Sequence, residues 1–314
     1  MSDESTPPLG ELLTVRDWLR WAVSRFSEAG LVFGHGTSRA VDEAAFLILH
    51  TLSLPIDELQ PWLDARLTLA ERSAVFDILR RRIETRKPAP YLTGRAWIGD
   101  ARFMVDERVI VPRSYIGELL LGSDVSAFAP EPDAIHRVLD LCTGSGCLAI
   151  LAARRFGGAV ADATDISGDA LAVARRNVDA YGLADRISLH QGDLFAPVRG
   201  QRYDLILANP PYVAAAEVAA FPPEYAAEPQ LAHLGGADGL DLVRRILVEA
   251  GEHLTPQGCL VIEVGTGREI LEAAYPKLPF LWLDTAESEG EVLVVAASHL
   301  APAGPKGKNA TSRR

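Results

Sequence analysis

The residues at 209–212 carry the clearest sign of chemistry in this sequence. An apolar run at 203–208 ends in Asn209, Pro210, Pro211 and Tyr212. Proline lacks the N–H that a strand donates to its neighbour, so a strand over 203–208 has to stop here. The amide of Asn209 is then held at the carboxyl end of a strand, beside two rigid residues and a ring. This pattern predicts a clamp for a planar polar group.

A clamp of this kind suits a nitrogen that is a poor nucleophile. The lone pair of a carboxamide or an exocyclic aromatic amine is delocalised, and accepting both N–H hydrogens would turn it toward an electrophile. The Asn209 side-chain oxygen and the Pro210 carbonyl supply two acceptors, and Tyr212 can stack on the planar group. Desolvated hydrogen bonds contribute about 1–3 kcal/mol each, and alignment of the reacting atoms contributes up to about 7–11 kcal/mol. We therefore expect catalysis from Asn209, Pro210, Pro211 and Tyr212.

A glycine-rich turn within 139–150, LDLCTGSGCLAI, is the strongest signal for a cofactor. Gly144 and Gly146 would let the backbone approach a ligand where a strand turns into a helix. A dinucleotide site would carry a third glycine in the pattern G-x-G-x-x-G, which this chain lacks. The carboxylate of Asp140 would repel a pyrophosphate and attract a cation. The turn thus favours S-adenosylmethionine, whose sulfonium and ammonium groups are positive.

Two further acidic residues end later strands. Asp165 follows the turn by about twenty residues, a position suited to ribose hydroxyls, and Asp193 is placed to meet an adenine amino group beside Leu194. A lone aspartate at a strand end is more often a turn former or a helix cap. Ligands of open α/β sheets, however, bind outside the carboxyl ends of the strands. We therefore expect these aspartates and Asn209 to line one crevice.

The elements that must position these residues alternate from residue 136 onward. Strands alternating with helices predict a parallel sheet with helices on both faces. Helices are expected from about Cys147 and after Ser167, which can cap the second of them. The predicted strands cover residues 137–142, 159–165, 187–193, 203–208, 258–264, 280–284 and 291–297.

The amino-terminal part has a different character. Residues 11–88 show helical spacing of apolar side chains, with Ser38 as a plausible cap and Thr68 with Glu71 as a capping box. Two short β-rich runs around residues 99–101 predict a hairpin linker. A basic cluster at the end of the last helix is either a solvated face or a contact surface for a partner; it comprises Arg80, Arg81, Arg82, Arg86 and Lys87. The predicted division is a helical substrate-recognition domain at 1–90, a linker at 91–116, a catalytic domain at 117–300 and a disordered tail at 301–314.

Composition restricts the partners. The chain of 314 residues has 31 basic and 42 acidic residues and a net charge of −11. This balance argues against a sequence-independent grip on nucleic acid and fits a basic protein partner better. Three cysteines make no disulfide framework, the start lacks the apolar segment of a signal peptide, and no run is long enough to span a membrane. The prediction is a cytoplasmic protein without a metal site.

The motifs occur in a familiar order. DLCTGSGCLAI, DATDIS, GDLF and NPPY together resemble the Rossmann-like S-adenosylmethionine-dependent methyltransferases. More narrowly, the chain resembles the HemK-like protein glutamine methyltransferases, which have a helical amino-terminal domain and a hairpin linker. GHGT (34–37), VPRSYIGELL (111–120), CTGSGC (142–147) and FPPEYAAEP (221–229) resemble the branch that acts on large-subunit ribosomal protein L-three. The release-factor branch typically reads R-P-E-T-E where this chain has residues 113–118.

The resemblance implies a fold, a reaction and a set of residues. The fold would be a Rossmann-like class I methyltransferase with a seven-stranded sheet, and the reaction would be methylation of a glutamine side-chain amide in ribosomal protein L-three, without direct nucleic-acid or membrane contact. S-adenosyl-L-methionine would be bound by Asp140, Thr143, Gly144, Ser145, Gly146, Asp165, Ile166, Asp193, Leu194 and Asn209.

Other interpretations stay open from the residues alone. The protein could methylate a glutamine of a release factor or, since such enzymes share the NPPY clamp, the exocyclic amine of adenine in a nucleic acid. It could also bind the cofactor without catalysis. Cys142 and Cys147 flank the cofactor turn and suit packing better than metal binding. Arg113 could contact a ligand or form a salt bridge, and Glu224 and Glu228 could shape a glutamine pocket within a substrate-covering segment.

Overall fold

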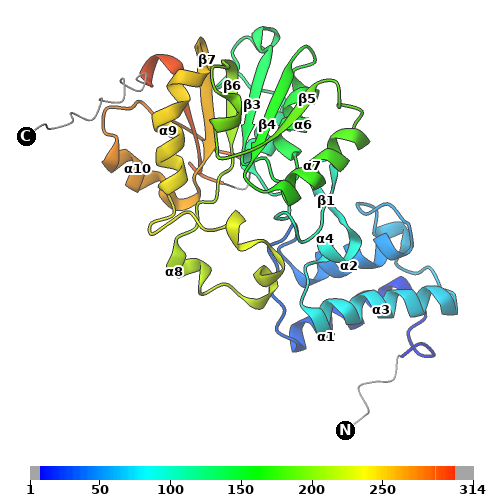
Figure 1. Cartoon of the computed structure of the whole chain (residues 1–314). Helices are drawn as coiled ribbons and strands as arrows, with labels where there is room; N and C mark the ends of the chain where they lie inside the picture. Colours follow the sequence, from blue (N-terminus) through cyan, green and yellow to red (C-terminus); the bar gives the residue numbers. More distant parts are fainter. Residues whose placement is uncertain (1–7, 287, 301–314) are drawn as a thin grey trace, which may run out of the picture.

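The computed structural model describes residues 8–286 and 288–300, so the predicted tail at 301–314 lies outside the described residues. Figure 1 shows a helical part that carries the amino terminus and, above it, a sheet flanked by helices. The helical part contains α1 (Val15–Glu28), α2 (Ala40–Thr51), α3 (Leu69–Thr85) and α4 (Ala89–Thr93).

Local capping chemistry sets the beginnings of these helices. The predicted capping box of α3 is confirmed: the Thr68 hydroxyl accepts from the N–H of Glu71, whose carboxylate accepts from the N–H of Thr68. The predicted cap of α2 is wrong, because the extended residue before that helix is Arg39 and not Ser38, and no side chain caps it. The helices enclose an apolar core that includes the fully buried Trp18 and Phe26.

The predicted hairpin is confirmed. β1 (Arg95–Ile98) pairs antiparallel with β2 (Ala101–Met104). Because side chains alternate along a strand, the hairpin buries one face, formed by Ala96, Ile98, Ala101 and Phe103, and exposes the other in part. A short helix follows, α5 (Tyr115–Leu121).

The sheet has seven strands in the order β5-β4-β3-β6-β7-β9-β8. Their bounds are β3 (Arg137–Leu141), β4 (Val160–Asp165), β5 (Ile187–Gln191), β6 (Tyr203–Ala208), β7 (Leu254–Glu263), β8 (Leu281–Leu283) and β9 (Val292–Ala296). The order reverses between β3 and β6, which is where ligands of such sheets bind. The predicted parallel pairing is confirmed from β5 to β7, whereas β9 runs antiparallel to both neighbours. Residues 284–291 are too few for the helical crossover that a parallel pair requires.

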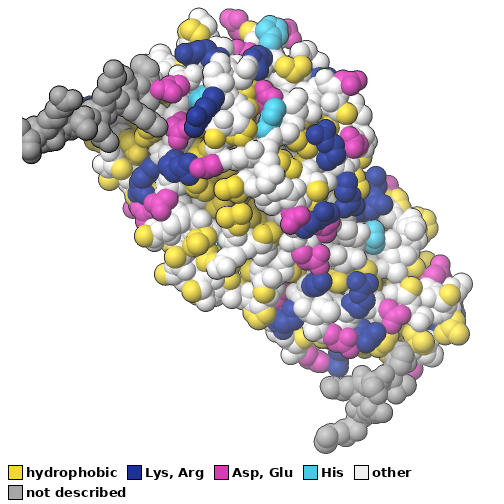
Figure 2. All heavy atoms as spheres, viewed as in Figure 1, with side chains coloured by type: hydrophobic (Ala, Val, Ile, Leu, Met, Phe, Trp, Pro, Cys, Tyr) yellow, Lys and Arg dark blue, Asp and Glu magenta, His cyan; other side chains and the backbone are white. Residues whose placement is uncertain are grey.

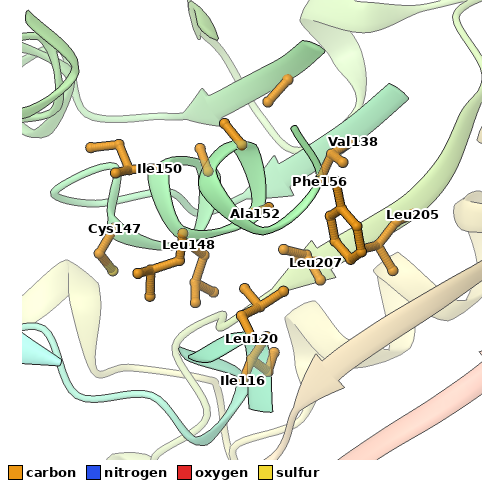
Figure 3. Close-up of a cluster of buried hydrophobic side chains, with 14 of the residues drawn as sticks. Ile116, Leu120, Val138, Cys147, Leu148, Ile150, Ala152, Phe156, Leu205 and Leu207 are labelled. Atoms are coloured by element: carbon orange, nitrogen blue, oxygen red, sulfur yellow. The ribbon is translucent and has the colours of Figure 1, made fainter. Parts of the chain in front are cut away.

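Helices cover the sheet. They are α6 (Cys147–Arg155), α7 (Gly168–Ala180), α9 (Asp241–His253) and α10 (Arg268–Ala274), with the single turn α8 (Ala215–Val218) after β6. Figure 3 shows the core around α6, where Leu148 lies near Leu120 and Ile116 of α5 and Leu207 of β6. A second core forms beneath α9. Both fix the strand ends from which the acidic residues emerge.

A buried guanidinium ties the helical part together. Arg82 of α3 is fully buried; its Nε donates to Oε1 of Glu43 at 2.6 Å, and its Nη2 donates to the carbonyl of Val32 at 3.1 Å. Burial raises the pKa of the Glu43 carboxyl, and Arg82 opposes that shift. Arg82 therefore belongs neither to a solvated face nor to a contact surface for a partner, because its guanidinium binds groups within the chain.

The same cluster joins the helical part to the segment after β6. Arg86 lies 2.7 Å from Oε1 of Glu224, which is fully buried and also accepts from the N–H of Val32 at 3.0 Å. Residues almost two hundred positions apart are thus connected by charged hydrogen bonds. These contacts anchor the predicted substrate-covering segment at its base.

Two substitutions on α3 compare what a buried and an exposed arginine contribute to the stability of the protein. Arg82→Met leaves Glu43 buried without its cation, so we expect it to lower the free energy of unfolding by about 3–5 kcal/mol. Arg80→Met removes an exposed pair with Glu84 on the same helix and should cost less than about 1 kcal/mol. Urea denaturation of both variants measures the difference. An equal decrease in the free energy of unfolding for both variants would contradict the stabilising role of the buried Arg82–Glu43 pair.

Candidate active site

The glycine turn after β3 adopts the conformation that its sequence predicts. Gly144 has φ +54° and Gly146 has φ +81°, values that disfavour a side chain. A Cβ on Gly146 would lie 3.2 Å from the Cβ of Ala174, so the turn also packs closely on α7. Gly144 lines the central cavity described below, whereas Gly146 does not.

Asp140 lies beneath this turn. It is 1% exposed, and its Oδ2 accepts from the Thr143 hydroxyl and from the N–H of Ala149 at 3.0 Å. Burial raises the pKa of the Asp140 carboxyl to about 7. Oδ1 has no hydrogen-bond partner in the described part of the chain. Asp140 thus holds the turn from behind and does not line the cavity, and its direct contact with the cofactor stays a prediction.

Asp165, at the end of β4, holds the turn from the front. Its Oδ2 accepts from the N–H of Gly144 and its Oδ1 from the N–H of Ser167, both at 2.9 Å. The hydroxyl of Ser167 caps α7, as predicted. Burial raises the pKa of Asp165 as well. Because Asp165 lines the cavity, its oxygens retain lone pairs for a ligand hydroxyl.

The end of β5 contributes a third carboxylate. Oδ2 of Asp193 accepts from Nη2 of Arg245, on α9, at 2.7 Å. The next residue, Leu194, has φ +46°, an uncommon backbone conformation that tends to occur at functional sites. Arg245 is a site residue that sequence reasoning missed, because the pattern of α9 indicates only an amphipathic helix.

These strand ends surround one cavity of about 270 Å³. Seven predicted residues line it: Gly144, Asp165, Ile166, Asp193, Leu194, Asn209 and Pro211. Six others do not: Asp140, Thr143, Ser145, Gly146, Pro210 and Tyr212. The one-crevice prediction holds for Asp165, Asp193 and Asn209, while Asp140 supports them.

Part of the cavity wall is apolar and exposed. Ile166, Leu231 and Leu234 are 55%, 60% and 42% exposed, which is unfavourable without a ligand or partner over them. Figure 2 shows apolar side chains gathered between the sheet and the segment near α8. Apolar surface next to carboxylates suits an adenosine, with its flat ring and ribose hydroxyls. The residues present thus fit the cofactor that the sequence indicates.

From the sequence, the covering role is predicted for residues 222–225, and residues 230–234 carry no prediction. The structure brings Pro229, Leu231, Ala232 and Leu234 to the cavity, together with Arg108–Ile110 from the segment after the hairpin. No local signal marks these residues, apart from the position of the segment after the NPPY motif.

The amide of Asn209 has a defined orientation. Its Nδ2 donates to the carbonyl of Arg113 at 3.4 Å. A carbonyl can only accept, so the amide nitrogen must face Arg113 and Oδ1 must face away. Within the described residues, no group donates to Oδ1 of Asn209 or to the carbonyl of Pro210. Both acceptors that the clamp requires therefore remain available.

Tyr212 supports the clamp from outside the cavity. Its hydroxyl donates to Oε1 of Glu263, at the end of β7, at 3.1 Å. Oε2 of Glu263 accepts from the Ser114 hydroxyl at 2.7 Å and from the N–H of Tyr115 at 3.1 Å. A Cβ on Gly265 would lie 2.8 Å from the Tyr212 ring. The Tyr212 ring is thus packed and its hydroxyl is engaged, and its stacking on the substrate stays a prediction.

Arg113 forms the salt bridge that was one of its two predicted roles. Its guanidinium donates to both oxygens of Glu228, at 3.0 and 2.7 Å. Glu228 is buried and also accepts from the N–H of Val111 at 2.9 Å. The rings of His35 and His233 face it, with Nε2 atoms 3.5 and 3.0 Å from Oε2, both off the axis of a hydrogen bond.

These contacts decide the charge of Glu228. Burial alone would raise its pKa, but His233, His35 and Arg113 together hold it well below its usual range. Neither Glu228 nor Glu224 lines the cavity. The expectation that they shape a glutamine pocket is not met, since both anchor the segment that covers the site.

The remaining sequence alternatives concern other ligands. In the part of the chain that the structure describes, no group of three His, Cys, Asp or Glu side chains is arranged to hold a metal ion. Cys142 lines the cavity and Cys147 is buried, and burial raises the pKa of both thiols. No described helix combines the length and apolar character that crossing a membrane needs.

Comparisons with known proteins agree with this geometry. Residues 121–221 match the methyltransferase small domain family, and residues 17–94 match the PrmC N-terminal domain. The hMettl16 catalytic domain, solved in complex with a MAT2A 3′UTR hairpin, has a similar fold at 15% identity and TM-score 0.50, covering 85% of this chain and 95% of that one. Fold and site define an α/β Rossmann-like class I methyltransferase.

The family follows from closer relatives. The ribosomal protein uL3 glutamine methyltransferase of Bradyrhizobium diazoefficiens is 56% identical over 93% of both chains. That of Burkholderia pseudomallei is 53% identical over 91% of this chain and 95% of its own. This chain belongs to the family of ribosomal protein uL3 glutamine methyltransferases.

Glu263 gives the site a measurable pH dependence. Burial raises the pKa of its carboxyl from 4.5 to about 7, although Ser114 and Tyr212 partly offset this. Between these values the folded protein binds more protons than the unfolded chain, so the free energy of unfolding falls as pH rises. Glu263→Gln lacks this term. We expect the wild-type stability, measured relative to the variant by urea denaturation, to decrease between pH 4.5 and 7 and to level off above pH 7; a constant difference would contradict the assignment.

Proposed function

We propose that this protein transfers a methyl group from S-adenosyl-L-methionine to the side-chain amide nitrogen of a glutamine in ribosomal protein uL3. One observation carries the proposal: the Asn209 amide is held by the Arg113 carbonyl so that Oδ1 is free beside the cavity. We infer uL3 as the substrate protein because the relatives are named ribosomal protein uL3 glutamine methyltransferases.

The cofactor binds in the cavity between the ends of β3, β4 and β5. Asp165 would hold the ribose hydroxyls, Ile166 and Leu194 would contact the adenine, and Asp193 would accept from its amino group. The methyl donor supplies a carbon that is already electrophilic, bonded to a sulfonium. No metal or covalent nucleophile is therefore needed from the protein.

The protein's contribution is to orient the nitrogen. Asn209 Oδ1 and the Pro210 carbonyl accept the two N–H hydrogens of the glutamine amide. This would fix the plane of the amide and stabilise the positive charge that grows on nitrogen as it gains a fourth bond. The new nitrogen–carbon bond would form as the carbon–sulfonium bond breaks, which leaves S-adenosylhomocysteine, and the nitrogen would then release one of its two protons to solvent. Pro211 makes the turn rigid, and the hydrogen bond from Tyr212 to Glu263 holds that turn in place. The covering segment at 229–234 excludes water.

Two alternatives are less well supported. A release factor as substrate conflicts with the sequence at 113–118, where Arg113 is bonded to Glu228 and Ser114 to Glu263. An adenine base would require the protein to extract it from a stacked nucleic acid, and the relatives are named for a protein substrate instead. A ribosomal protein substrate also fits the predicted cytoplasmic location.

A labelling experiment separates these possibilities. The enzyme is incubated with tritiated S-adenosylmethionine and, in parallel, with purified uL3, a release factor, or RNA and DNA. We expect label only in uL3, with mass spectrometry placing one added methyl group on a glutamine. Label in the release factor or the nucleic acid would reject the substrate, and tight cofactor binding without any transfer would reject catalysis.

Two substitutions separate the clamp from the cofactor site. Asn209→Ala removes an acceptor, so we expect transfer to fall by about a hundredfold or more, with the Kd for S-adenosylmethionine changed only a few fold. Asn209→Asp keeps an oxygen at this position and should retain part of the activity. Asp165→Ala should chiefly weaken cofactor binding. Calorimetry and single-turnover rates distinguish them, and loss of cofactor binding in Asn209→Ala would reject the assigned role.

A further inference from the structure

A second hollow shares no lining residue with the catalytic cavity. It is formed by the hairpin, α6 and α7, and its charged and aromatic lining consists of Arg95, Trp97, Asp100, Arg102, Arg154, Arg176 and Tyr181. Four arginines against one aspartate make this hollow basic, in a chain whose net charge is −11. We refer to it as the arginine groove.

The alternation of the hairpin produces one side of the groove. Trp97 stands directly opposite Arg102, and Arg95 stands opposite Met104, so these four side chains share a face. The other face is buried in the core. The outer face of the hairpin therefore carries two cations, a large ring and a thioether.

The arginines of the groove are mostly unpaired. Within residues 8–286 and 288–300, no carboxylate lies within ion-pair distance of Arg95, Arg102 or Arg154. Arg154 instead lies over the Tyr181 ring, with its guanidinium carbon 5.5 Å from the ring centroid. Arg176 has a carboxylate partner, Asp106, at 3.2 Å. Figure 2 shows basic side chains gathered where β1 and α7 lie in Figure 1.

The floor of the groove is rigid and connected to the cofactor turn. Asn177 accepts from the N–H of Met104 at 2.7 Å and donates to the carbonyls of Met104 at 3.0 Å and Ser145 at 2.9 Å. The Tyr181 hydroxyl donates to the carbonyl of Arg102 at 3.0 Å. The arginines are thus displayed from a preformed surface, which reduces the entropy lost on binding a partner.

We propose that the arginine groove binds single-stranded RNA. Guanidinium groups pair with phosphates in bidentate fashion. The half-buried ring of Trp97, which meets Phe46 edge to face at 5.4 Å between ring centroids, can stack on an unpaired base. The Tyr181 ring, by contrast, already packs against Arg154 and Phe103. An acidic protein segment would use the cations but not the ring of Trp97. The groove lies on the same chain as the methyl-transfer site, so the enzyme can hold RNA while its clamp engages a protein side chain. This RNA contact stands independently of the substrate proposed above.

Fluorescence anisotropy with a labelled single-stranded RNA oligonucleotide tests the proposal. The variant Arg95→Gln/Arg102→Gln/Arg154→Gln should lose about tenfold or more in affinity. Its plot of log K against log salt should be shallower by about 2, because each phosphate contact to a single strand contributes about 0.7. A matched variant, Arg20→Gln/Arg81→Gln/Arg199→Gln, removes the same charge at exposed positions elsewhere and should bind RNA like the wild type.

A second variant tests the aromatic component. Trp97→Leu should weaken RNA binding several-fold and leave the salt dependence unchanged, since stacking releases no counterions. S-adenosylmethionine binding by both groove variants verifies that they are folded. Three results would overturn the proposal: no RNA binding by the wild type, equal losses in the matched variant, or polyglutamate of the same length displacing the RNA at equal concentration.

Discussion

The bidentate pair between Arg113 and Glu228 holds the three working parts of this enzyme in register. Glu228 belongs to the segment after β6, Arg113 to the segment after the hairpin, and His35, which faces the same carboxylate, to the helical part. The Arg113 carbonyl then accepts from the amide of Asn209. A buried carboxylate outside the cavity is thus connected through Arg113 to the orientation of the Asn209 amide.

Removing the charge of Glu228 from water is unfavourable, and the hydrogen bonds around its carboxylate compensate for the lost hydration. Glu228 accepts from two guanidinium N–H groups and one backbone N–H, and two imidazoles face it. Burial of an ion pair rarely adds much stability, but loss of one partner is severe because the other charge stays buried. The arrangement specifies one relative placement of the parts rather than simply strengthening the fold.

The catalytic cavity has the opposite electrostatic character. Asp140, Asp165 and Glu263 have raised pKa values because burial penalises their charged forms, and they have few cations near them. A cationic cofactor would supply part of the missing compensation when it binds. The cavity is lined by two carboxylates and two arginines, Asp165, Asp193, Arg108 and Arg245, whereas the arginine groove is lined by four arginines and one aspartate.

The order of the sheet elements and the chemistry of the strand ends could be predicted from the sequence. Apolar runs, glycines and prolines act over a few residues, and the carboxyl ends of parallel strands share one edge of a sheet, so Asp165, Asp193 and Asn209 had to meet. The antiparallel direction of β9 was missed, because it follows from the short connection after β8 rather than from a strand pattern.

Other features were decided only by tertiary structure, since burial depends on contacts between segments far apart in the chain. The pattern of α3 marks Arg82 as one more surface cation, yet packing against Glu43 buries it. Asp140 looks like a ligand contact by type and position, but the turn folds over it. The arginine groove needs the hairpin, α6 and α7 to converge. Local sequence determined which groups this protein has for chemistry, and long-range packing decided which of them face a ligand.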